Sequence, residues 1–514
     1  MNLLRATTVV CLSLSLSASV LGKTRGELTQ ERVKANPKAK WWEAMDTGPF
    51  ISDTFLGFGP KGEVTAMKGI AIKIGPDEKQ TVVFDTENLR MVAGFHGVVK
   101  MAGTPWNANH IDNSFLPEKR KSYFFATERG PGVAVNGDWA DPRPTKNGPL
   151  PDAQAEYHGL YRHESGTVLS YSVGGSKVLE MPSTIGKAIM RSFDVEQMKN
   201  DVDLLILDPL EGGRKIKVDL AGEPQGVSLK TLPSGRIVLS LKKGSEGSFD
   251  LVYAPEDSAI AIPKRNSLEG LLKGGPSLFP EVITTKGRKG EPKNGYAIDD
   301  IPLPKENPWE SNIRFAAYDF FPGGKSVACS TWNGDVWVAE GIDGDISEIK
   351  WRRFASGLYQ TLGLKIVDGV IHTQGRDQIT RLHDLNNDGE ADFYECFNND
   401  VLITKGFHEF AFDLQTDDEG NFYFSKGAPV LKGGRGFSEL TEHSGTILKV
   451  SRDGETLTTL ATGLRAPGGL GLGPNGELTT GENEGSYVPR CKITWSKPDG
   501  SSFHGVVPLS LIHI

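Results

Sequence analysis

The sequence lacks the features of disulfide-stabilised, membrane-spanning and nucleic-acid-binding proteins. Only three of its cysteines, Cys329, Cys396 and Cys491, lie beyond the first 22 residues, and three cannot all pair within one chain. No C-x-x-C-H motif occurs in these residues, so we expect a covalent c-type haem only in a missing C-terminal part. No apolar run after the N-terminus approaches the roughly 20 residues of a membrane span. A net charge of −8 without a long Lys/Arg run makes nucleic acid an unexpected partner.

The composition is typical of a soluble protein with many strands. Its 514 residues suffice for two or three domains, and 38% hydrophobic and 24% charged residues are ordinary values. The 61 glycines and 30 prolines are spread along the chain, which suits strands that are joined by tight turns.

Both ends of the chain have special features. Residues 1–22 begin with a charge at Arg5, continue with an apolar stretch and end near Gly22, which predicts a secretory signal peptide. Cys11 lies inside the apolar stretch and no lipobox precedes it, so we expect an exported periplasmic or extracellular protein and not a lipoprotein. Residues 509–514 resemble the translated end of a sequencing adapter, which predicts a truncated reading frame; a short apolar tail is the alternative.

Residues 23–255 predict a short helical segment followed by a sandwich of strands. Residues 23–52 contain a helical stretch and the Trp41–Trp42 pair, which we expect to clasp the next domain. Alternation of apolar and polar residues dominates residues 53–255, and Gly174–Gly175 between two such runs is a two-residue hairpin signature. An antiparallel β-sandwich over 53–255 is the simplest account.

The second half of the chain predicts a linker and part of a propeller. Residues 256–311 are rich in Pro, Gly and Lys, which predicts an extended linker on the surface. Over residues 312–508 a turn leading into a strand recurs at intervals of one or two blades of about 40–50 residues. About three to four blades are visible, fewer than most closed propellers have. The predicted fold class is therefore all-β, an N-terminal antiparallel β-sandwich followed by a C-terminally truncated β-propeller.

The acidic segment 384–395 has the spacing of a calcium-binding loop. Oxygen-bearing side chains occupy positions one, three, five and nine, glycine position six and a carboxylate position twelve. The predicted ligands are Asp384, Asn386, Asp388, the carbonyl of Glu390, Asp392 and Glu395. The alternative is an acidic surface turn, because D-x-N-x-D-G also favours turns. Since the loop lies among short strands, we expect Ca²⁺ to have a structural role.

Six motifs besides this loop carry a family resemblance. They are KGIAIK at 68–73, VFDT at 83–86, MVAGF at 91–95, NGDVWV at 333–338, RDQITRL at 376–382 and GFHEF at 406–410. Together they resemble a family of large exported proteins of planctomycetes and verrucomicrobia. In that family an uncharacterised N-terminal β-domain precedes a propeller similar to soluble quinoprotein glucose and sorbosone dehydrogenases. Many members continue into a haem c domain.

The resemblance implies a site for pyrroloquinoline quinone (PQQ) on the axial face of the propeller. It implies His408 as the general base, Arg465 as a catalytic and cofactor-binding residue, and Gln360 as a further cofactor-binding residue. Ala466 stands where the family has Asn, which removes one cofactor contact. The alternatives are a loop histidine bonded to a backbone carbonyl for His408 and a polar turn residue for Gln360.

Three functions are compatible with these observations. The first is an exported oxidoreductase that oxidises a carbohydrate or polyol with a quinone and passes electrons to a c-type cytochrome. The second is a non-catalytic propeller that binds glycans or a protein. The third is a calcium-dependent, lactonase-like hydrolase. His158 and His163, five residues apart on an expected strand, have no metal-ligand spacing and are expected to be structural.

Overall fold

The computed structural model describes residues 23–58, 64–101, 114–115, 123–209, 216–222, 224–257, 260–262, 265–406, 408–431, 436–484 and 491–504. The expectations for residues 1–22 and 509–514 lie outside this part of the chain. Regular structure in the described residues is almost entirely strand, which confirms the predicted all-β class. No helix in the same residues has the length and apolar character that crossing a membrane requires.

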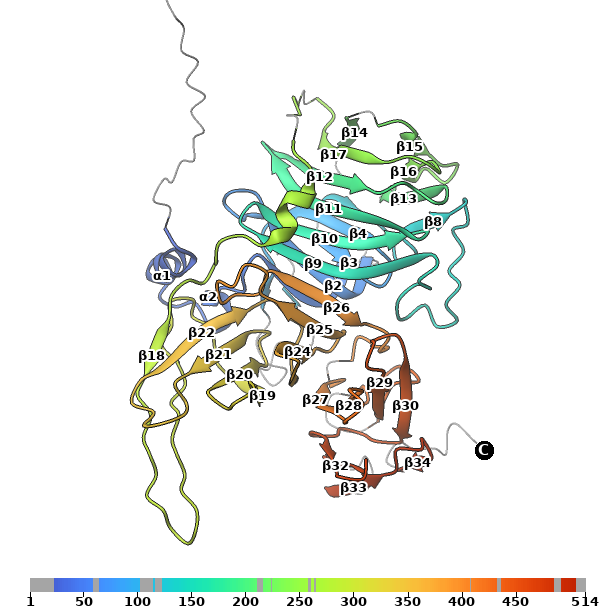
Figure 1. Ribbon diagram of the computed structural model, residues 1–514. Helices are drawn as coiled ribbons and strands as arrows, with labels where there is room; N and C mark the ends of the chain where they lie inside the picture. Colours follow the sequence, from blue (N-terminus) through green and yellow to red (C-terminus); the bar gives the residue numbers. More distant parts are fainter. Residues whose placement is uncertain are drawn as a thin grey trace, which may run out of the picture.

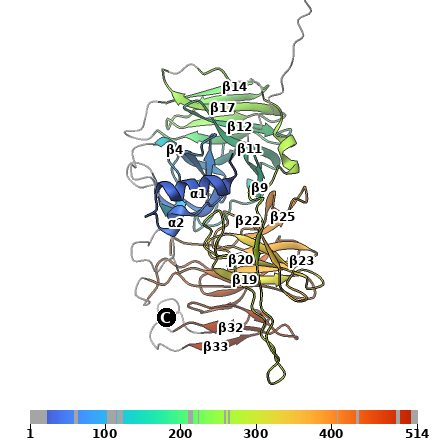
Figure 2. The same cartoon turned by 90° about the vertical axis from the view of Figure 1, so that its left-hand side faces the viewer.

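Two helices precede the first strand. They are α1 (Arg25–Ala35) and α2 (Trp41–Ala44). The hydroxyl of Thr24 accepts the N–H of Glu27, whose carboxylate accepts the N–H of Thr24, so α1 begins with a capping box. The helix lies against the side of the sandwich (Figure 2), and Gln30 donates to the carbonyl of Pro308 at 3.0 Å.

Two antiparallel sheets form the sandwich. The first sheet has the order β1 (Phe50–Phe58), β2 (Val64–Ile74), β3 (Gln80–Asp85), β4 (Arg90–His96) and β7 (Tyr123–Ala126). The second contains β9 (Ala155–His163), β10 (Gly166–Val173), β11 (Ser176–Ile185), β12 (Ala188–Val195), β17 (Gly247–Pro255) and β14 (Ile216–Ala221). Phe84 stacks on Tyr171 between the sheets at 5.7 Å, and Phe125 stacks on Tyr253 at 4.1 Å. The hairpin predicted at Gly174–Gly175 joins β10 to β11 and is confirmed.

Two smaller sheets accompany the sandwich. One consists of β8 (Val133–Val135), β13 (Val202–Leu207), β16 (Ile237–Leu241) and β15 (Val227–Thr231). The other is the ribbon of β5 (Lys100–Met101) and β6 (Ser114–Phe115). Buried residues of β13 and β16, among them Leu204 and Leu239, belong to the same core as the two main sheets.

The second half of the chain forms successive antiparallel sheets. The first has β19 (Phe315–Phe320), β20 (Ser326–Thr331), β21 (Val336–Glu340), β22 (Ile349–Ala355) and the added edge strand β18 (Ile283–Thr285). The next is formed by β23 (Gly363–Val367), β24 (Val370–Gln374), β25 (Ile379–His383) and β26 (Phe393–Asn398). The third has β27 (Ala411–Thr416), β28 (Phe422–Lys426), β29 (Thr446–Val450), β30 (Leu457–Thr462) and β34 (Ser502–Phe503). The last has β31 (Gly471–Leu472), β32 (Leu478–Glu482) and β33 (Lys492–Ser496).

These sheets are arranged as the blades of a propeller arc. The first strands of successive sheets are neighbours, since β19 contacts β23, β23 contacts β27 and β27 contacts β31. Inner strands of adjacent blades meet in this way in β-propellers. Both ends of the arc expose apolar side chains, Tyr318 and Phe320 on β19 and Ile493 and Trp495 on β33.

The sandwich and the arc share one continuous sheet. β26, the outer strand of the second blade, pairs antiparallel with β9 of the sandwich, with Phe393 opposite Tyr161 and Glu395 opposite Gly159. A single ten-stranded sheet therefore runs from β14 to β23 and crosses the middle of the molecule (Figure 1).

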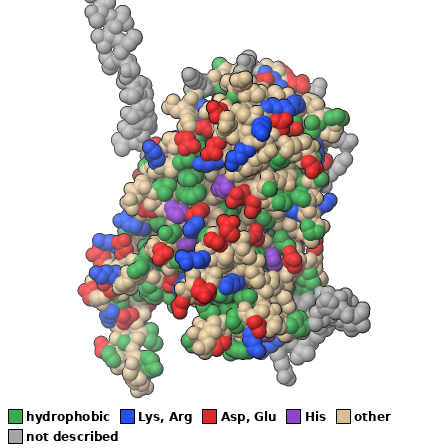
Figure 3. Space-filling view, turned by 45° about the vertical axis from the view of Figure 1, so that its right-hand side comes forward, with side chains coloured by type: hydrophobic (Ala, Val, Ile, Leu, Met, Phe, Trp, Pro, Cys, Tyr) green, Lys and Arg blue, Asp and Glu red, His purple; other side chains and the backbone are tan. Residues whose placement is uncertain are grey.

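Residues 256–311, expected as a surface linker, are packed at several points. The 3₁₀ helix η1 (Leu268–Lys273) covers the outer face of the sandwich, where Leu268 is buried against Val168 and Leu179. Trp309 is fully buried, and β18 extends the first blade. Residues 286–301 project from the molecule as an exposed extension (Figures 1 and 2), which we call the arm. On the face shown in Figure 3, Lys and Arg side chains are interspersed with Asp and Glu, and no large patch carries charge of one sign.

Candidate functional site

Three connections between successive blades lie at the same axial end of the blades. Residues 356–362 lead into β23, residues 399–410 lead into β27 and residues 463–470 lead into β31. Because these inner strands are neighbours in equivalent positions, the connections that enter them lie at the same axial end. Gln360, His408 and Arg465 lie in the three connections, one in each. The structure therefore brings the three residues implied by the resemblance to the same axial end of the blades.

His408 lies close to Arg465 beside the end of β28. The carbonyl of Arg465 accepts the N–H of Ala428 at 2.8 Å, and Nδ1 of His408 is 3.4 Å from the carbonyl oxygen of Val430. Burial lowers the pKa of His408, and the positive charges of Arg465 and Arg376 lower it further against the opposing effect of the Val430 carbonyl. His408 is thus neutral near pH 7, the form that accepts a proton.

Glu482 on β32 orients the connection that carries Arg465. Its carboxylate accepts the backbone N–H of Arg465 at 3.0 Å and that of Ala466 at 2.7 Å. Nη1 of Arg465 donates to the carbonyl of Asn483 at 2.8 Å. The backbone of residue 466 is therefore held in place although its side chain is Ala.

Arg376 ties together the connections that carry Gln360 and His408. Its backbone N–H donates to the carbonyl of Tyr359 at 2.9 Å, and its Nη2 donates to the carbonyls of Thr404, at 3.0 Å, and Gly406. Nε and Nη1 of Arg376, and Oε1 of Gln360, are buried without a hydrogen-bond partner among the described residues. Gln360 also has a φ of +45°, an uncommon conformation for a residue other than glycine. Buried, incompletely bonded groups of this kind are a common property of binding sites.

A buried ion pair next to His408 is absent from the sequence prediction. Oε1 of Glu409 accepts from Nζ of Lys426 at 2.6 Å, and neither side chain has any exposed surface. Oε2 of Glu409 accepts the N–H of Thr404 at 2.7 Å. The sequence contains one signal for this role, since Glu409 directly follows His408 in the GFHEF motif; nothing in the pattern points to Lys426.

The first sheet of the sandwich covers the same axial end. Oγ1 of Thr54 on β1 lies 2.9 Å from the hydroxyl of Tyr359, and Nζ of Lys68 on β2 donates to the carbonyl of Asn399 at 2.5 Å. Asp53 is buried beside them, and burial raises its pKa to about 7. The sandwich therefore contributes charged groups to the site, which sequence analysis of the two halves as separate domains missed.

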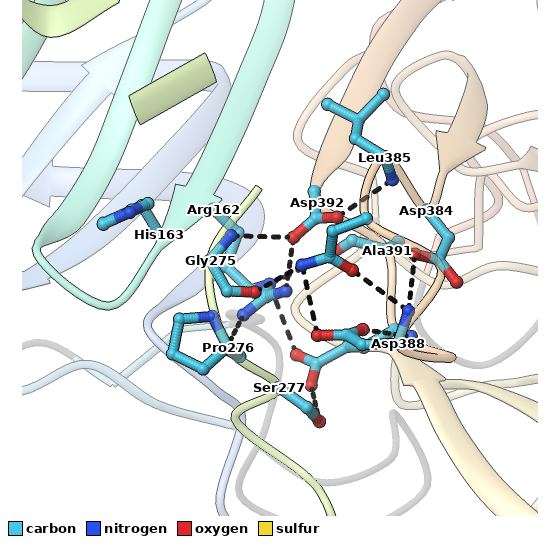
Figure 4. A network of polar contacts seen from close by, with 12 residues as sticks. Arg162, His163, Gly275, Pro276, Ser277, Asp384, Leu385, Asp388, Ala391 and Asp392 are labelled. Carbon is cyan, nitrogen blue, oxygen red and sulfur yellow. Dashed lines mark hydrogen bonds and ion pairs between the residues drawn. The ribbon is translucent and has the colours of Figure 1, made fainter. Parts of the chain in front are cut away.

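The acidic loop lies at the other end of the second blade. It joins β25 to β26, whereas Arg376 lies in the turn from β24 to β25, and consecutive turns of an antiparallel sheet are at opposite ends of its strands. In Figure 4 the loop meets Arg162 of β9 and residues 275–277. It therefore contacts both the sandwich and the segment 256–311, which was expected to be a linker. A metal in this loop would therefore be distant from His408 and could act only on structure.

The first four of the six predicted calcium ligands lie between residues 384 and 390 of the loop. Oδ1 and Oδ2 of Asp384 accept the N–H groups of Asp388, at 3.1 Å, and Gly389, at 2.9 Å; Oδ1 of Asn386 also accepts the N–H of Asp388. The side chain of Glu390 turns away and accepts from Ser277 and from the backbone at 278 and 279, which leaves its carbonyl as the oxygen that the prediction requires. No three carboxylate, histidine or cysteine side chains converge within the described residues, so Asp384, Asp388 and Asp392 do not form a carboxylate cluster.

The two remaining predicted ligands are engaged by cations. Oδ1 of Asp392 accepts from Nη2 of Arg162 at 2.7 Å (Figure 4). Both oxygens of Glu395 are 2.6 Å from partners on β25, one from Arg381 and the other from His383. Position twelve of the loop is thus held on the sheet, while position nine remains beside the other ligands.

Comparisons with known proteins give one domain match and distant structural likenesses. Residues 82–180 match the family described as "Domain of unknown function (DUF6797)". No curated protein matches the sequence. These 99 residues extend from β3 into β11 and so form the centre of the sandwich.

Three solved structures illustrate the likeness of fold. The PQQ domain of pyranose dehydrogenase from Coprinopsis cinerea is 11% identical over 33% of this chain and 44% of that chain, with a TM-score of 0.27. The soluble aldose sugar dehydrogenase of Escherichia coli is 12% identical over 38% of this chain and 70% of that chain, with a TM-score of 0.24. The β-propeller domain of Cps50 from Myceliophthora thermophila is 10% identical over 87% of this chain and 96% of that chain, with a TM-score of 0.23. The chain thus spans less than half of the pyranose dehydrogenase domain. It is an all-β protein that contains a domain of unknown function and is distantly similar in structure to sugar dehydrogenases and to a β-propeller domain.

Proposed function

We propose that this protein is an exported oxidoreductase that oxidises a sugar or related alcohol with a quinone and passes the electrons to a c-type cytochrome. The observation that carries the proposal is the placement of His408 and Arg465 in adjacent connections at the axial end of the blades, where the charge of Arg465 helps to keep His408 neutral. Removing a hydride equivalent from an alcohol requires a base for the hydroxyl proton and a positive charge for the electrons that arrive on the acceptor. His408 and Arg465 supply these two groups.

The residues at this end fit an anionic quinone such as PQQ. Two guanidinium groups, those of Arg376 and Arg465, suit carboxylates and quinone oxygens. The free amide oxygen of Gln360 and the free nitrogens of Arg376 are buried and available for further hydrogen bonds. When bound, PQQ would supply a two-electron acceptor. Gln360 and Arg465 would hold it, with Arg376 as an additional contact.

The protein's own residues prepare the reaction in two ways. His408 takes the hydroxyl proton at its neutral imidazole. The buried pair Glu409–Lys426 and the contact between Thr54 and Tyr359 fix the surrounding connections and exclude water. Charges act more strongly in such a water-poor site than in solution.

The structure also supports a proposal for the acidic loop. Asp384, Asn386, Asp388 and the carbonyl of Glu390 would bind Ca²⁺, with Asp392 as a fifth ligand when it leaves Arg162. The ion would fasten the β25–β26 turn to the segment at 275–279 and to β9. Its role is structural, because the loop is at the opposite end of the blade from His408.

The test is reconstitution of the full chain with PQQ and calcium. We expect quinone absorbance to remain with the protein after desalting and an artificial dye to be reduced when an aldose is added. His408→Ala should slow dye reduction by roughly 10²–10⁴-fold, the effect of losing a general base. His163→Ala is the matched control, because this histidine lies on the sandwich and bonds only locally, to the N–H of Ser165 at 3.0 Å.

Other outcomes would select the alternatives. If no quinone absorbance survives desalting, the cofactor assignment is wrong. Binding of immobilised glycans without turnover would then favour a non-catalytic propeller. Calcium-dependent opening of a sugar lactone would favour the hydrolase.

A further inference from the structure

Three polar side chains on the outer face of the sandwich form a chain of contacts from a serine through a histidine to a carboxylate. Oγ of Ser172 on β10 is 2.6 Å from Nε2 of His158 on β9. The other ring nitrogen of His158, Nδ1, is 3.5 Å from Oε1 of Glu156. The atoms follow the order that activates a serine nucleophile, with Nε2 facing the hydroxyl and Nδ1 facing the carboxylate. Triad contacts are often long before substrate binds.

A β-bulge aims the histidine at the serine. Tyr157 pairs with Tyr171 and Gly159 pairs with Ser170, so His158 is an extra residue between two register positions. Bulges re-aim a side chain and are frequent beside active sites. Gly159 allows the bulge to pass under β26, because a Cβ at this position would lie 2.3 Å from the carbonyl oxygen of Tyr394. The local backbone is thus shaped to hold His158 where it is.

The three groups are accessible to solvent. The side chain of His158 is 32% exposed and that of Glu156 is 49% exposed. Ser172 is half-buried, while Tyr157 and Tyr171 point into the core. A substrate can therefore reach the serine from solvent without any change in the fold.

The strand on the other side of Ser172 contributes a cation and the wall of a hollow. Lys177 on β11 is directly opposite Ser172, so both side chains lie on the same face. Lys177 also lines, with Leu179, Asp194, Glu196 and Ser248, a hollow of about 190 Å³ that lies beside Lys177 and not against Ser172. Burial lowers the pKa of His158 and the charge of Lys177 lowers it further, against the opposing effect of Asp152, so the imidazole is neutral at pH 7.

We propose that Ser172, His158 and Glu156 form a second active site, which hydrolyses small carboxylic esters such as acetyl esters. This activity needs no quinone.

The reaction balances without a redox step. Oγ of Ser172 bonds to the ester carbonyl carbon while Nε2 of His158 takes the serine proton. The bond from carbon to the alkoxy oxygen breaks, and the alcohol leaves with that proton. Water then attacks the acyl-serine, His158 accepts a proton from it and returns a proton to Ser172, and the carboxylic acid leaves. Glu156 holds the ring and stabilises the imidazolium, and Lys177 faces the oxygen that becomes negative.

A fluorophosphonate probe and p-nitrophenyl acetate test this site in the intact protein without PQQ. We expect one probe per chain, attached to Ser172 by peptide mass mapping. Ser172→Ala should abolish both labelling and hydrolysis, and His158→Gln should slow hydrolysis by roughly 10²–10⁴-fold. Glu156→Gln should cause a smaller loss, with its main effect on the maximal rate and not on KM. The rate should fall only at pH values below the ordinary titration range of histidine, because the pKa of His158 is lowered.

The matched control is Ser170→Ala, two residues away on the same face of β10. It should keep full labelling and hydrolysis. Absence of label on Ser172 would overturn the proposal. Equal labelling of the parent and of His158→Gln would also overturn it, because the serine would then react without the histidine. Circular dichroism of each variant separates loss of the site from loss of the fold.

Discussion

At the scale of single residues, charged side chains are buried where the sandwich meets the propeller arc. Lys68, Glu409 and Lys426 have at most 1% of their side-chain surface exposed. Removing charges from water costs several kcal/mol per ion unless each is paired. Lys68 is paired with Glu87 of the sandwich at 3.5 Å and Glu409 with Lys426 of the arc at 2.6 Å, while Lys68 also donates to the carbonyl of Asn399 in the other half of the chain. Asp53, which is buried in the same region, has a pKa raised to about 7, so its charge changes near neutral pH.

Asp53 should make the protein less stable as the pH rises. Burial raises its pKa in the folded protein to about 7, against opposing effects of the Thr54 N–H and Arg376. The folded state therefore binds this proton more tightly than the unfolded state does. The stability that results is complete below the ordinary Asp pKa of about 3.9 and is lost as the pH rises through about 7.

The variant Asp53→Asn should remove much of this dependence. Urea unfolding of the parent is expected to show a free energy of unfolding that declines between pH 5 and pH 8. In Asp53→Asn the decline should be smaller, and the variant should be more stable than the parent at pH 8 by on the order of a few kcal/mol. Asp257→Asn on an exposed turn is the control and should follow the parent. Identical slopes for the parent and Asp53→Asn would show that Asp53 is not protonated in the folded protein.

At the scale of elements, one turn between two strands fastens three parts of the chain. The β25–β26 loop accepts from Arg162 of β9 through Asp392, and from the backbone at 278 and 279 through Glu390. Its own backbone N–H groups are satisfied by Asp384 and Asn386. The loop is thus ordered by its own hydrogen bonds, and calcium would add to an arrangement that already exists.

Calcium binding can be tested by comparing Asp384 and Asp388, which we propose as ligands, with Glu395, which the sequence alone also predicts as a ligand. Calcium at 100 times its Kd should stabilise the parent by about 2.7 kcal/mol. Asp384→Asn with Asp388→Asn should abolish this response, because two charged ligands are lost. Glu395→Gln should keep most of it, because both oxygens of Glu395 are engaged by Arg381 and His383. The measurement is the melting temperature across a calcium titration. If Glu395→Gln also loses the response to calcium, Glu395 is a calcium ligand after all.

At the scale of the whole molecule, the sandwich and the arc are joined by main-chain hydrogen bonds. β9 pairs with β26, and β18, which precedes the arm, pairs with β22. Both pairings connect residues before the arm with residues after it. A cut in the arm therefore breaks the chain but neither pairing.

Limited trypsin digestion should show this behaviour. The first cut is expected in the arm, at Lys289 or Lys293, where Tyr296 and Ile298 are 79% and 85% exposed. The two fragments should separate on a denaturing gel but elute together in gel filtration. The fragments of Gly159→Val should dissociate more readily, because the new side chain meets the Tyr394 carbonyl of β26. Separate elution of the fragments from the parent protein would show that the sheet is not continuous in solution.

Much of this architecture was predictable because it depends on local patterns. Alternating residues predicted the strands over 53–255, two adjacent glycines predicted the turn between β10 and β11, and recurring turns predicted the blades. The order of Gln360, His408 and Arg465 also led to three connections that meet at one axial end. Each of these features depends on residues close together in the sequence or on a repeat.

The remaining features depend on which surfaces meet, and only the tertiary structure decided them. The sequence of β26 is typical of an outer blade strand, and its residues do not indicate that it pairs with β9, more than 200 positions earlier. The same holds for Lys68 and Asn399, whose contact adds charges of the sandwich to the axial site. The pattern predicts a regular strand around His158, whereas a bulge at this position turns the side chain toward Ser172. The sequence by itself determined the strands, turns and blades of this protein through local backbone preferences, and tertiary packing decided their partners, because strand pairing and burial of charge are properties of two segments at once.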